Sequence, residues 1–331
     1  MSEKYITMAH GSGGLETENL IHEIFSAAFN NEYLSQMEDS TIVLGSHKIA
    51  LTTDSFVVTP TEFPGGDIGR LCICGTVNDL LMRGAMPKYL TCGFILEEGA
   101  SMDVLKRIAQ SMGETAKEAK VLLVAGDTKV VGGKGNIYIN TTGVGFIDEK
   151  REELGAKCCE QGDCIIVSGN LGEHHAAILS SRMNIENHIQ SDCAPLNQMV
   201  MKLLENKIQV HAMRDVTRGG LATILKELAI ASKKNFKIWE SRLPVSDTVK
   251  DFCGLLGLDP LYMGNEGKMA AIVSKDDAQK ALEIIKRCPY GNDAAIIGHV
   301  ESGDGKLLME TSIGGLRNLE VLTGEGLPRI C

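Results

Sequence analysis

The sequence predicts an α+β protein with two α/β domains and a short C-terminal tail. The chain has 331 residues, more than one typical domain. Strand and helix signals alternate along its first half, and the alternation restarts after the charged segment 148–155. Near the end, Gly324, Gly326 and Pro328 favour an irregular, exposed path. We therefore expect domains over residues 1–152 and 153–318 and a flexible tail over 319–331.

The first domain opens with strand signals. Residues 41–44 and 48–53 are apolar runs around a short turn that contains Gly45, which predicts a hairpin. Asp67 then begins a helical pattern with spaced apolar residues, and 89–96 is expected to be a strand.

A capped helix and two strands complete this domain. Ser101 is the expected N-cap of a helix whose apolar face runs from Leu105 to Met112. Strands are expected at 121–125 and 137–144. The charged segment 148–155 is the best candidate for a linker.

The second domain repeats the alternation of strands and helices. His174 and His175 fall in one of its helices. We expect them to pack or to face solvent, because no third ligand at suitable spacing accompanies them. The expected strands are 164–167, 269–273, 294–299 and 307–309, and the expected helices are 174–183, 197–204, 219–232 and 276–287.

Composition excludes several classes of protein. With 44% hydrophobic and 23% charged residues the chain is typical of globular proteins, and its net charge of −10 disfavours nucleic acid. No apolar run is long enough to cross a membrane and the start is too polar for a signal peptide, so we expect a cytoplasmic protein. The ten cysteines lack the spacing of a zinc site and are expected to be reduced thiols.

Four aspartates stand at the ends of expected elements, several of them beside glycine. Each could be a helix cap or a turn residue when it is considered alone. Together, short carboxylates in this setting suit Mg²⁺, which takes oxygen ligands and shares them with nucleotide phosphates. The candidates are Asp54, Asp79, Asp127 and Asp215.

Two glycine-rich stretches suit phosphate binding. Residues 10–14 and the pair Gly219 and Gly220 would let backbone N–H groups approach phosphate oxygens, the pair at the start of a helix. The chain contains no Walker motif, so an ATP site here would be of another kind.

The chain ends on a thiol, Cys331. If the nine residues from Thr323 were extended, they would reach roughly 30 Å. Such a thiol could carry a group between two sites, or could be a chance residue at a frayed end. The tail alone leaves both interpretations open.

These motifs occur together in a known family. Along its full length the chain resembles the carbamoyl dehydratases of nickel-iron hydrogenase maturation, within the superfamily of aminoimidazole ribonucleotide synthetase and selenophosphate synthetase. The terminal tetrapeptide from Pro328 to Cys331 selects this family, whereas the other motifs are shared more widely. The matching segments are Ala9 to Gly14, Thr52 to Ser55, Asn78 to Ala85, Gly126 to Lys129, Asp215 to Gly220, Asn265 to Gly267 and Pro328 to Cys331.

The resemblance implies a defined reaction. A partner carbamoyltransferase places a carbamoyl group on Cys331, ATP phosphorylates the carboxamide oxygen, and loss of phosphate leaves an S-cyanide (thiocyanate). The cyanide then passes to iron on a scaffold complex. The resemblance also implies a homodimer formed through the N-terminal sheets and a C-terminal α/β sandwich.

Site roles follow from the same resemblance. Cys331, Glu266 and Lys129 are the expected catalytic residues, with Glu266 as the base and Lys129 near the reacting group. The residues alone also allow a turn role for Glu266 and a solvated loop position for Lys129. The Mg²⁺ ligands are expected to be Asp54, Asp79, Asp127 and Asp215, and the ATP-binding residues His10, Gly13, Gly14, Thr128, Arg218, Gly219 and Gly220.

Two alternatives remain. A selenophosphate synthetase would need a reactive cysteine or selenocysteine in its N-terminal segment, and the first 71 residues contain no cysteine. A non-catalytic carrier would use the tail only to present a modified thiol, and the intact acidic motifs argue against it.

Overall fold

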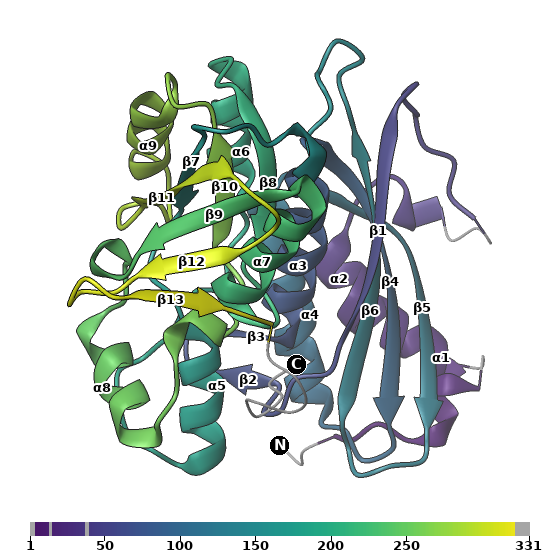
Figure 1. The fold of residues 1–331 in the computed structure, drawn as a ribbon. Helices are drawn as coiled ribbons and strands as arrows, with labels where there is room; N and C mark the ends of the chain where they lie inside the picture. Colours follow the sequence, from purple (N-terminus) through teal and green to yellow (C-terminus); the bar gives the residue numbers. More distant parts are fainter. Residues whose placement is uncertain (1–3, 13–14, 37–39, 322–331) are drawn as a thin grey trace.

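The computed structural model describes residues 4–12, 15–36 and 40–321, and contains two sheets that share a buried helix (Figure 1). The first sheet has the strand order β1-β6-β4-β5, and the second has the order β13-β12-β9-β11-β7-β10-β8. The predicted α+β class is confirmed. The domain boundaries stay predictions, and Gly13, Gly14, Cys331 and the tail from 322 onward lie outside the described residues.

The first sheet is mostly antiparallel, with one parallel pair at its edge. Its strands are β1 (Ile49–Phe56), β4 (Met86–Glu97), β5 (Leu122–Val131) and β6 (Ile137–Phe146), and β4 runs parallel to β5. A separate ribbon is formed by β2 (Glu62–Phe63) and β3 (Gly66–Asp67). The helical segments are η1 (Met8–Gly11), α1 (Leu15–Leu20), η2 (Ile21–Ser26), α2 (Ala27–Phe29), η3 (Leu34–Gln36), α3 (Ile68–Met82) and α4 (Met102–Glu118).

The predicted hairpin over 41–53 is wrong. Only its second arm is a strand, and this strand, β1, pairs with the distant β6. The first arm forms no strand, and its Ile42 and Leu44 are 90% and 79% exposed. Local apolar residues do not identify a strand's partner, because pairing is decided by the face that becomes buried.

The two predicted helix starts are confirmed by their caps. Asp67 accepts a hydrogen bond from Arg70 N at the start of α3, and Ser101 accepts one from Val104 N at the start of α4. Each cap satisfies a backbone donor that the first helical turn leaves free.

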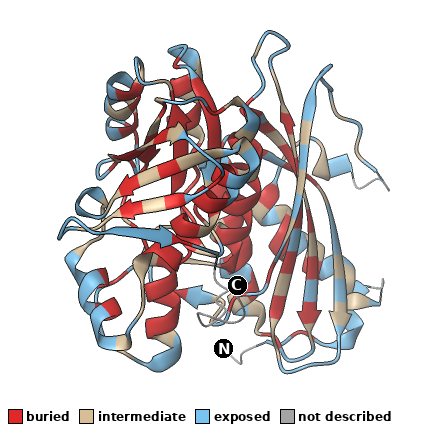
Figure 2. Cartoon of the chain, viewed as in Figure 1, coloured by how far each residue is buried: buried red, intermediate tan, exposed pale blue. Residues whose placement is uncertain are grey.

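The first sheet has one covered and one open face. On the covered face α3, α4 and η2 pack against the strands, and the Phe25 and Phe94 rings lie 4.6 Å apart. No helix of the described chain covers the other face (Figure 2). Several large apolar side chains of this face are exposed. Among them are Ile49, Leu51, Ile95, Leu122 and Val131.

The second sheet has seven strands, and the elements that the sequence predicted here are confirmed. Its strands are β7 (Cys164–Val167), β8 (Val210–Asp215), β9 (Lys234–Trp239), β10 (Met269–Val273), β11 (Ala295–Ser302), β12 (Leu307–Glu310) and β13 (Leu316–Leu319). The helical segments are η4 (Ala156–Cys158), α5 (Glu173–Met183), α6 (Asn197–Glu205), α7 (Gly220–Ser232), η5 (Glu240–Arg242), α8 (Asp247–Leu256), η6 (Pro260–Tyr262) and α9 (Ala278–Lys286). In the described ranges no helix could cross a membrane.

Helix α3 lies between the two sheets. It contacts β1 and β6 of the first sheet and β8 of the second, and all of its residues except Arg70 and Asp79 are buried. A helix that is apolar on every side belongs in the interior of a protein. One continuous apolar core therefore extends from the first half of the chain into the second.

The histidine pair on α5 is buried, which confirms that it packs inside the protein. His174 shares a 2.7 Å hydrogen bond with Ser191 Oγ, and His175 Nε2 has no hydrogen-bond partner among the described residues. Burial lowers the pKa of His175 to about 4, and the nearby charge of Arg182 acts in the same direction. Folding therefore holds this ring in its neutral form.

The pH dependence of stability should reveal this buried ring. His175 binds a proton more readily in the unfolded chain, so its contribution to the free energy of unfolding should fall as the pH is lowered below about 6.5, by up to about 1.4 kcal/mol per unit. We expect His175→Leu to make this slope shallower and not to abolish it, because burial also lowers the pKa of His174 to about 4. Urea unfolding of both proteins at about pH 7 and about pH 5 measures the difference, and equal slopes would contradict the assignment.

Candidate active site

A cavity of about 220 Å³ lies where the two sheets meet across α3. Its walls come from the end of β1, the middle of α3, the turn between β8 and α7, and the segment before β10. It brings together five of the predicted site residues, which are Asp54, Asp79, Asp215, Arg218 and Glu266.

Each aspartate of the cavity is placed by a different element. Asp54 lies on β1, where its Oδ1 accepts a 2.8 Å hydrogen bond from Ser55 N. Asp79 on α3 accepts a 2.7 Å hydrogen bond from Thr52 Oγ1, which ties the helix to β1. Asp215 is the last residue of β8 and lies opposite Met269 of β10.

The cavity disfavours negative charge. Burial raises the pKa of Asp215 to about 6, and the neighbouring Asp79 carboxylate adds to this shift. Burial also raises the pKa of Asp79, against the hydrogen bond from Thr52. Carboxylates in this state are stabilised in their charged form by a cation, and Mg²⁺ is usually held by one or two carboxylates together with phosphate oxygens.

Glu266 is the most deeply buried acid of the cavity. It is 9% exposed, and burial followed by the charges of Asp215, Asp192 and Asp54 raises its pKa well above the usual value. A buried carboxylate with a raised pKa is a stronger base when it is ionised. Such a group suits proton transfer to or from a substrate.

The predicted metal ligands do not all meet within one chain. Asp127 lies on β5, at the sheet edge opposite the one formed by β1 and Asp54. There it pairs with Lys129 at 2.8 Å, and both side chains are about two-thirds exposed. Within the described chain, no group of three or more His, Cys, Asp or Glu side chains is arranged to hold a metal unaided.

A second region surrounds Asp127. The His10 loop packs here, since a Cβ on Gly11 would lie 2.8 Å from Val130 Cβ of β5. Beside it is a pocket of about 290 Å³ whose aromatic wall includes Phe25 and Phe29 and whose rim includes Asp127 and Thr128. The site residues thus form two groups, one around the cavity and one along β5.

The glycine pair at the start of α7 adopts left-handed backbone conformations. Gly219 and Gly220 have φ values of +78° and +64°, which glycine adopts without strain. A Cβ on Gly220 would also lie 2.4 Å from Leu261 O. The first turn of α7 therefore begins two residues after Arg218 of the cavity, and Gly220 N donates a 3.0 Å hydrogen bond to Thr217 O.

Two residues that bind backbone groups next to the cavity were not predicted from the sequence. Asn78 lay within a noted motif but received no role, and Asp192 was not singled out. Asn78 Oδ1 accepts from Leu196 N at 2.9 Å, and Asp192 Oδ1 accepts from Glu266 N at 3.1 Å. A polar residue inside the apolar pattern of α3 was the available signal for Asn78, and nothing in the sequence marked Asp192.

Comparison with known proteins identifies the family. Residues 37–147 match the N-terminal domain of AIR synthase related proteins, and residues 160–309 match their C-terminal domain. The carbamoyl dehydratase HypE of Cupriavidus necator is 46% identical over 98% of this chain and 95% of its own length. This chain belongs to the HypE family of AIR synthase related proteins.

Solved structures of the HypE family agree with this assignment. A HypE structure in complex with ATP superposes with a TM-score of 0.94 at 42% identity, covering 98% of this chain and 99% of that one. HypE in a HypE-HypF complex superposes with a TM-score of 0.80 at 45% identity, covering 92% and 99%. The resemblance seen in the sequence motifs is confirmed.

Proposed function

We propose that this protein is an ATP-dependent carbamoyl dehydratase of hydrogenase maturation that converts an S-carboxamide on Cys331 into a thiocyanate. The observation that carries the proposal is the cavity that places buried Glu266 among three carboxylates, in a chain 46% identical to a protein named carbamoyl dehydratase HypE. The family's ATP complex supports ATP as the co-substrate.

The reaction needs an activated oxygen and a base. The carboxamide oxygen attacks the γ-phosphorus of ATP, ADP leaves, and one N–H proton is lost. The second N–H proton then leaves as the C–O bond breaks and phosphate departs, which forms the C≡N bond. Water is a poor leaving group from an amide, whereas phosphate is a good one, so phosphorylation makes the elimination feasible.

Glu266 is the proposed base. Its carboxylate lies in a cavity with little exposure to water, where a proton on the substrate nitrogen could reach it. Lys129 is proposed to offset charge on the transferring phosphoryl group. Phosphate oxygens would contact the backbone around His10, Gly13, Gly14 and Thr128, and the Arg218, Gly219 and Gly220 turn.

The carboxylates around Glu266 fit a divalent cation. Asp54, Asp79 and Asp215 would hold Mg²⁺ together with phosphate oxygens, which relieves the repulsion that burial imposes on them. When bound, the cation supplies positive charge to the phosphates during transfer.

A homodimer would complete the site. Lys129 lies opposite Ile95 in the β4/β5 register, so both project from the open face of the first sheet. If two copies of this apolar face were apposed about a two-fold axis parallel to the strands, the β5 edge of one sheet would lie against the β1 edge of the other. Lys129 of the partner subunit would then lie beside the cavity that holds Asp54.

Two further partners are proposed. A carbamoyltransferase would load Cys331, which the HypE-HypF complex of the family supports. An iron-carrying scaffold would accept the cyanide. Both reactions are expected to take place in the cytoplasm, consistent with the absence of a membrane-spanning helix from the described part of the chain.

Replacing the terminal thiol should abolish product. Because a serine alcohol is a far weaker nucleophile than a thiolate near neutral pH, Cys331→Ser should remain folded and acquire no carbamoyl group. Intact-protein mass spectrometry after incubation with the carbamoyltransferase, carbamoyl phosphate and ATP gives the answer. Cys158→Ser, at a partly exposed cysteine of the described chain, is the control, and modification of Cys331→Ser would refute the role of the tail thiol.

Removing one cavity charge should weaken ATP binding only when Mg²⁺ is present. Asp215→Asn keeps the side chain's shape and removes a proposed ligand, so we expect roughly a tenfold loss of affinity with Mg²⁺ and none without it. Calorimetric titration with ATP measures both values. Asp247→Asn, on the exposed surface of α8, should change neither, and an unchanged Asp215→Asn would place the cation elsewhere.

Substituting the proposed base should separate binding from elimination. Glu266→Gln should bind ATP and accept carbamoyl on Cys331, yet form thiocyanate on the order of 10² to 10⁴ times more slowly. The readout is loss of the mass of one water from the carbamoylated protein. Glu283→Gln on α9 is the control. Normal dehydration by Glu266→Gln would remove Glu266 from the mechanism.

A further inference from the structure

The backbone of Glu266 is held by a loop that the proposed mechanism does not use. Residues 190–194 run beside 265–268, and Asp192 Oδ1 accepts the hydrogen bond from Glu266 N at 3.1 Å. In the following peptide, Glu266 O accepts from Ala194 N at 3.4 Å and from Asn78 Nδ2 at 3.4 Å. The residue is thus fixed at both its N–H and its C=O.

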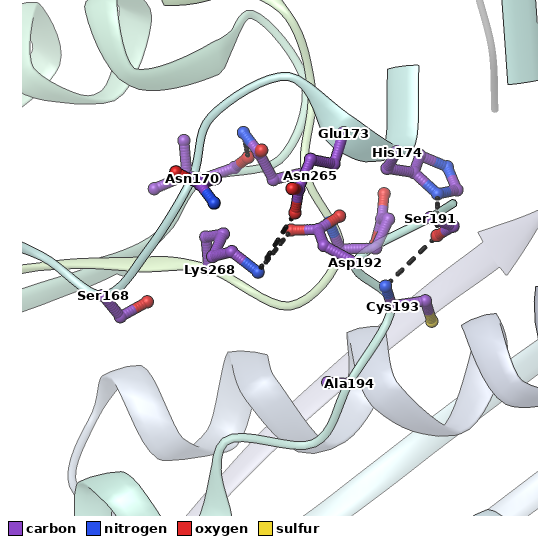
Figure 3. Close-up of polar contacts among 12 residues, drawn as sticks. Ser168, Asn170, Glu173, His174, Ser191, Asp192, Cys193, Ala194, Asn265 and Lys268 are labelled. Carbon is purple, nitrogen blue, oxygen red and sulfur yellow. Dashed lines mark hydrogen bonds and ion pairs between the residues drawn. The ribbon is translucent and has the colours of Figure 1, made fainter. Parts of the chain in front are cut away.

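The two segments are in backbone contact. A Cβ on Gly267 would lie 1.9 Å from Asp192 O, so only glycine lets the segments approach this closely. Two hydrogen bonds hold the turn that contains Asp192. Ser191 Oγ accepts one from Cys193 N at 3.1 Å and shares another with His174 Nδ1 at 2.7 Å (Figure 3). Asp192 therefore has little freedom to move.

The negative charge of Asp192 is paired with Lys268, which does not line the cavity that contains Glu266. Its side chain is 1% exposed, and its Oδ2 has no hydrogen-bond partner in the described structure but lies 3.3 Å from Lys268 Nζ. Lys268 is also buried, and Glu173 Oε2 lies 3.9 Å from its Nζ. A carboxylate that is paired with an ammonium group accepts a stronger hydrogen bond from a backbone N–H than a neutral group does.

Asp192 does not reach the reacting groups. It lines a different pocket, of about 380 Å³, together with Lys268 and Glu173, whereas Glu266 lines the cavity of about 220 Å³. Asp192 can therefore act on the reaction only through Glu266, by its hydrogen bond to the Glu266 backbone and by its negative charge, which helps to raise the pKa of the Glu266 carboxyl. A displacement on the order of 1 Å at a catalytic group can cost up to about 100-fold in rate.

We propose that Asp192 is a positioning residue that fixes the Glu266 backbone so that its carboxylate meets the substrate nitrogen. This inference rests on the proposed function of Glu266 as the base. The position of the acceptor atom is what matters, because Glu266 N donates its hydrogen bond to that atom. Nothing in this role requires Asp192 to contact ATP, the cation or Cys331.

Two matched substitutions separate position from charge. Asp192→Asn keeps an oxygen at the Oδ1 position and loses the charge, so it should retain most of the dehydration rate. Asp192→Glu keeps the charge beside Lys268 but moves the carboxylate by one methylene, so it should be roughly 10-fold to 100-fold slower. The assay is single-turnover loss of water from the carbamoylated protein at saturating ATP, followed by intact-protein mass spectrometry.

ATP affinity should be unchanged in both proteins, so the loss appears in the rate constant alone. Calorimetry measures the affinity, and thermal unfolding verifies that each variant is folded. If Asp192→Glu dehydrates normally, or if Asp192→Asn is the slower of the two, the positioning role is wrong. Should Asp192→Asn fail to fold because Lys268 is left buried, Asp192→Glu alone still decides the matter.

A double substitution shows whether Asp192 acts through Glu266. In the Glu266→Gln background, Asp192→Glu should cause no further loss, because there is no base left to position. Losses that multiply would show an independent effect and overturn the inference. A normal rate for Glu266→Gln alone would instead refute the proposed base, so failure of the two proposals can be told apart.

Discussion

Burial of α3 between the two sheets is the constraint on which the rest of the structure depends. Its residues face the first sheet on one side and the second on the other, and only Arg70 and Asp79 escape full burial. Gly75 allows the close approach, since a Cβ there would lie 2.9 Å from the Phe56 ring. The helix could not leave either sheet without exposing the shared core, so it sets how the two halves meet.

The same burial creates the chemistry of the site. Asp79 projects from this helix into a cavity where Asp54 and Asp215 also end, and low exposure raises the pKa values of Asp79 and Asp215. Repulsion between carboxylates that lie close together in a buried site lowers the stability of the fold. A bound cation with phosphate oxygens would relieve this repulsion. The cavity is therefore suited to a charged ligand more than to an apolar one.

The structure divides the predicted site residues into two groups by topology. Strand β1, with Asp54, and strand β5, with Asp127, form opposite edges of the first sheet. Asp127 and Lys129 project from the open face, and Asp54 from the covered one. Within one chain these groups stay apart, and the proposed homodimer would bring them together across the open apolar face.

The sequence by itself determined most helices and strands, the four aspartates and the family, because capping residues, apolar periods and short motifs are local properties of the chain. Asp67 and Ser101 marked helix starts correctly for this reason. Only the tertiary structure decided that β1 pairs with β6, that Asp127 lies apart from the other acids, and that Asp192 holds Glu266. All three depend on how residues far apart in the chain are arranged. That arrangement follows from which faces of the elements are buried together, and a local sequence pattern does not contain this information.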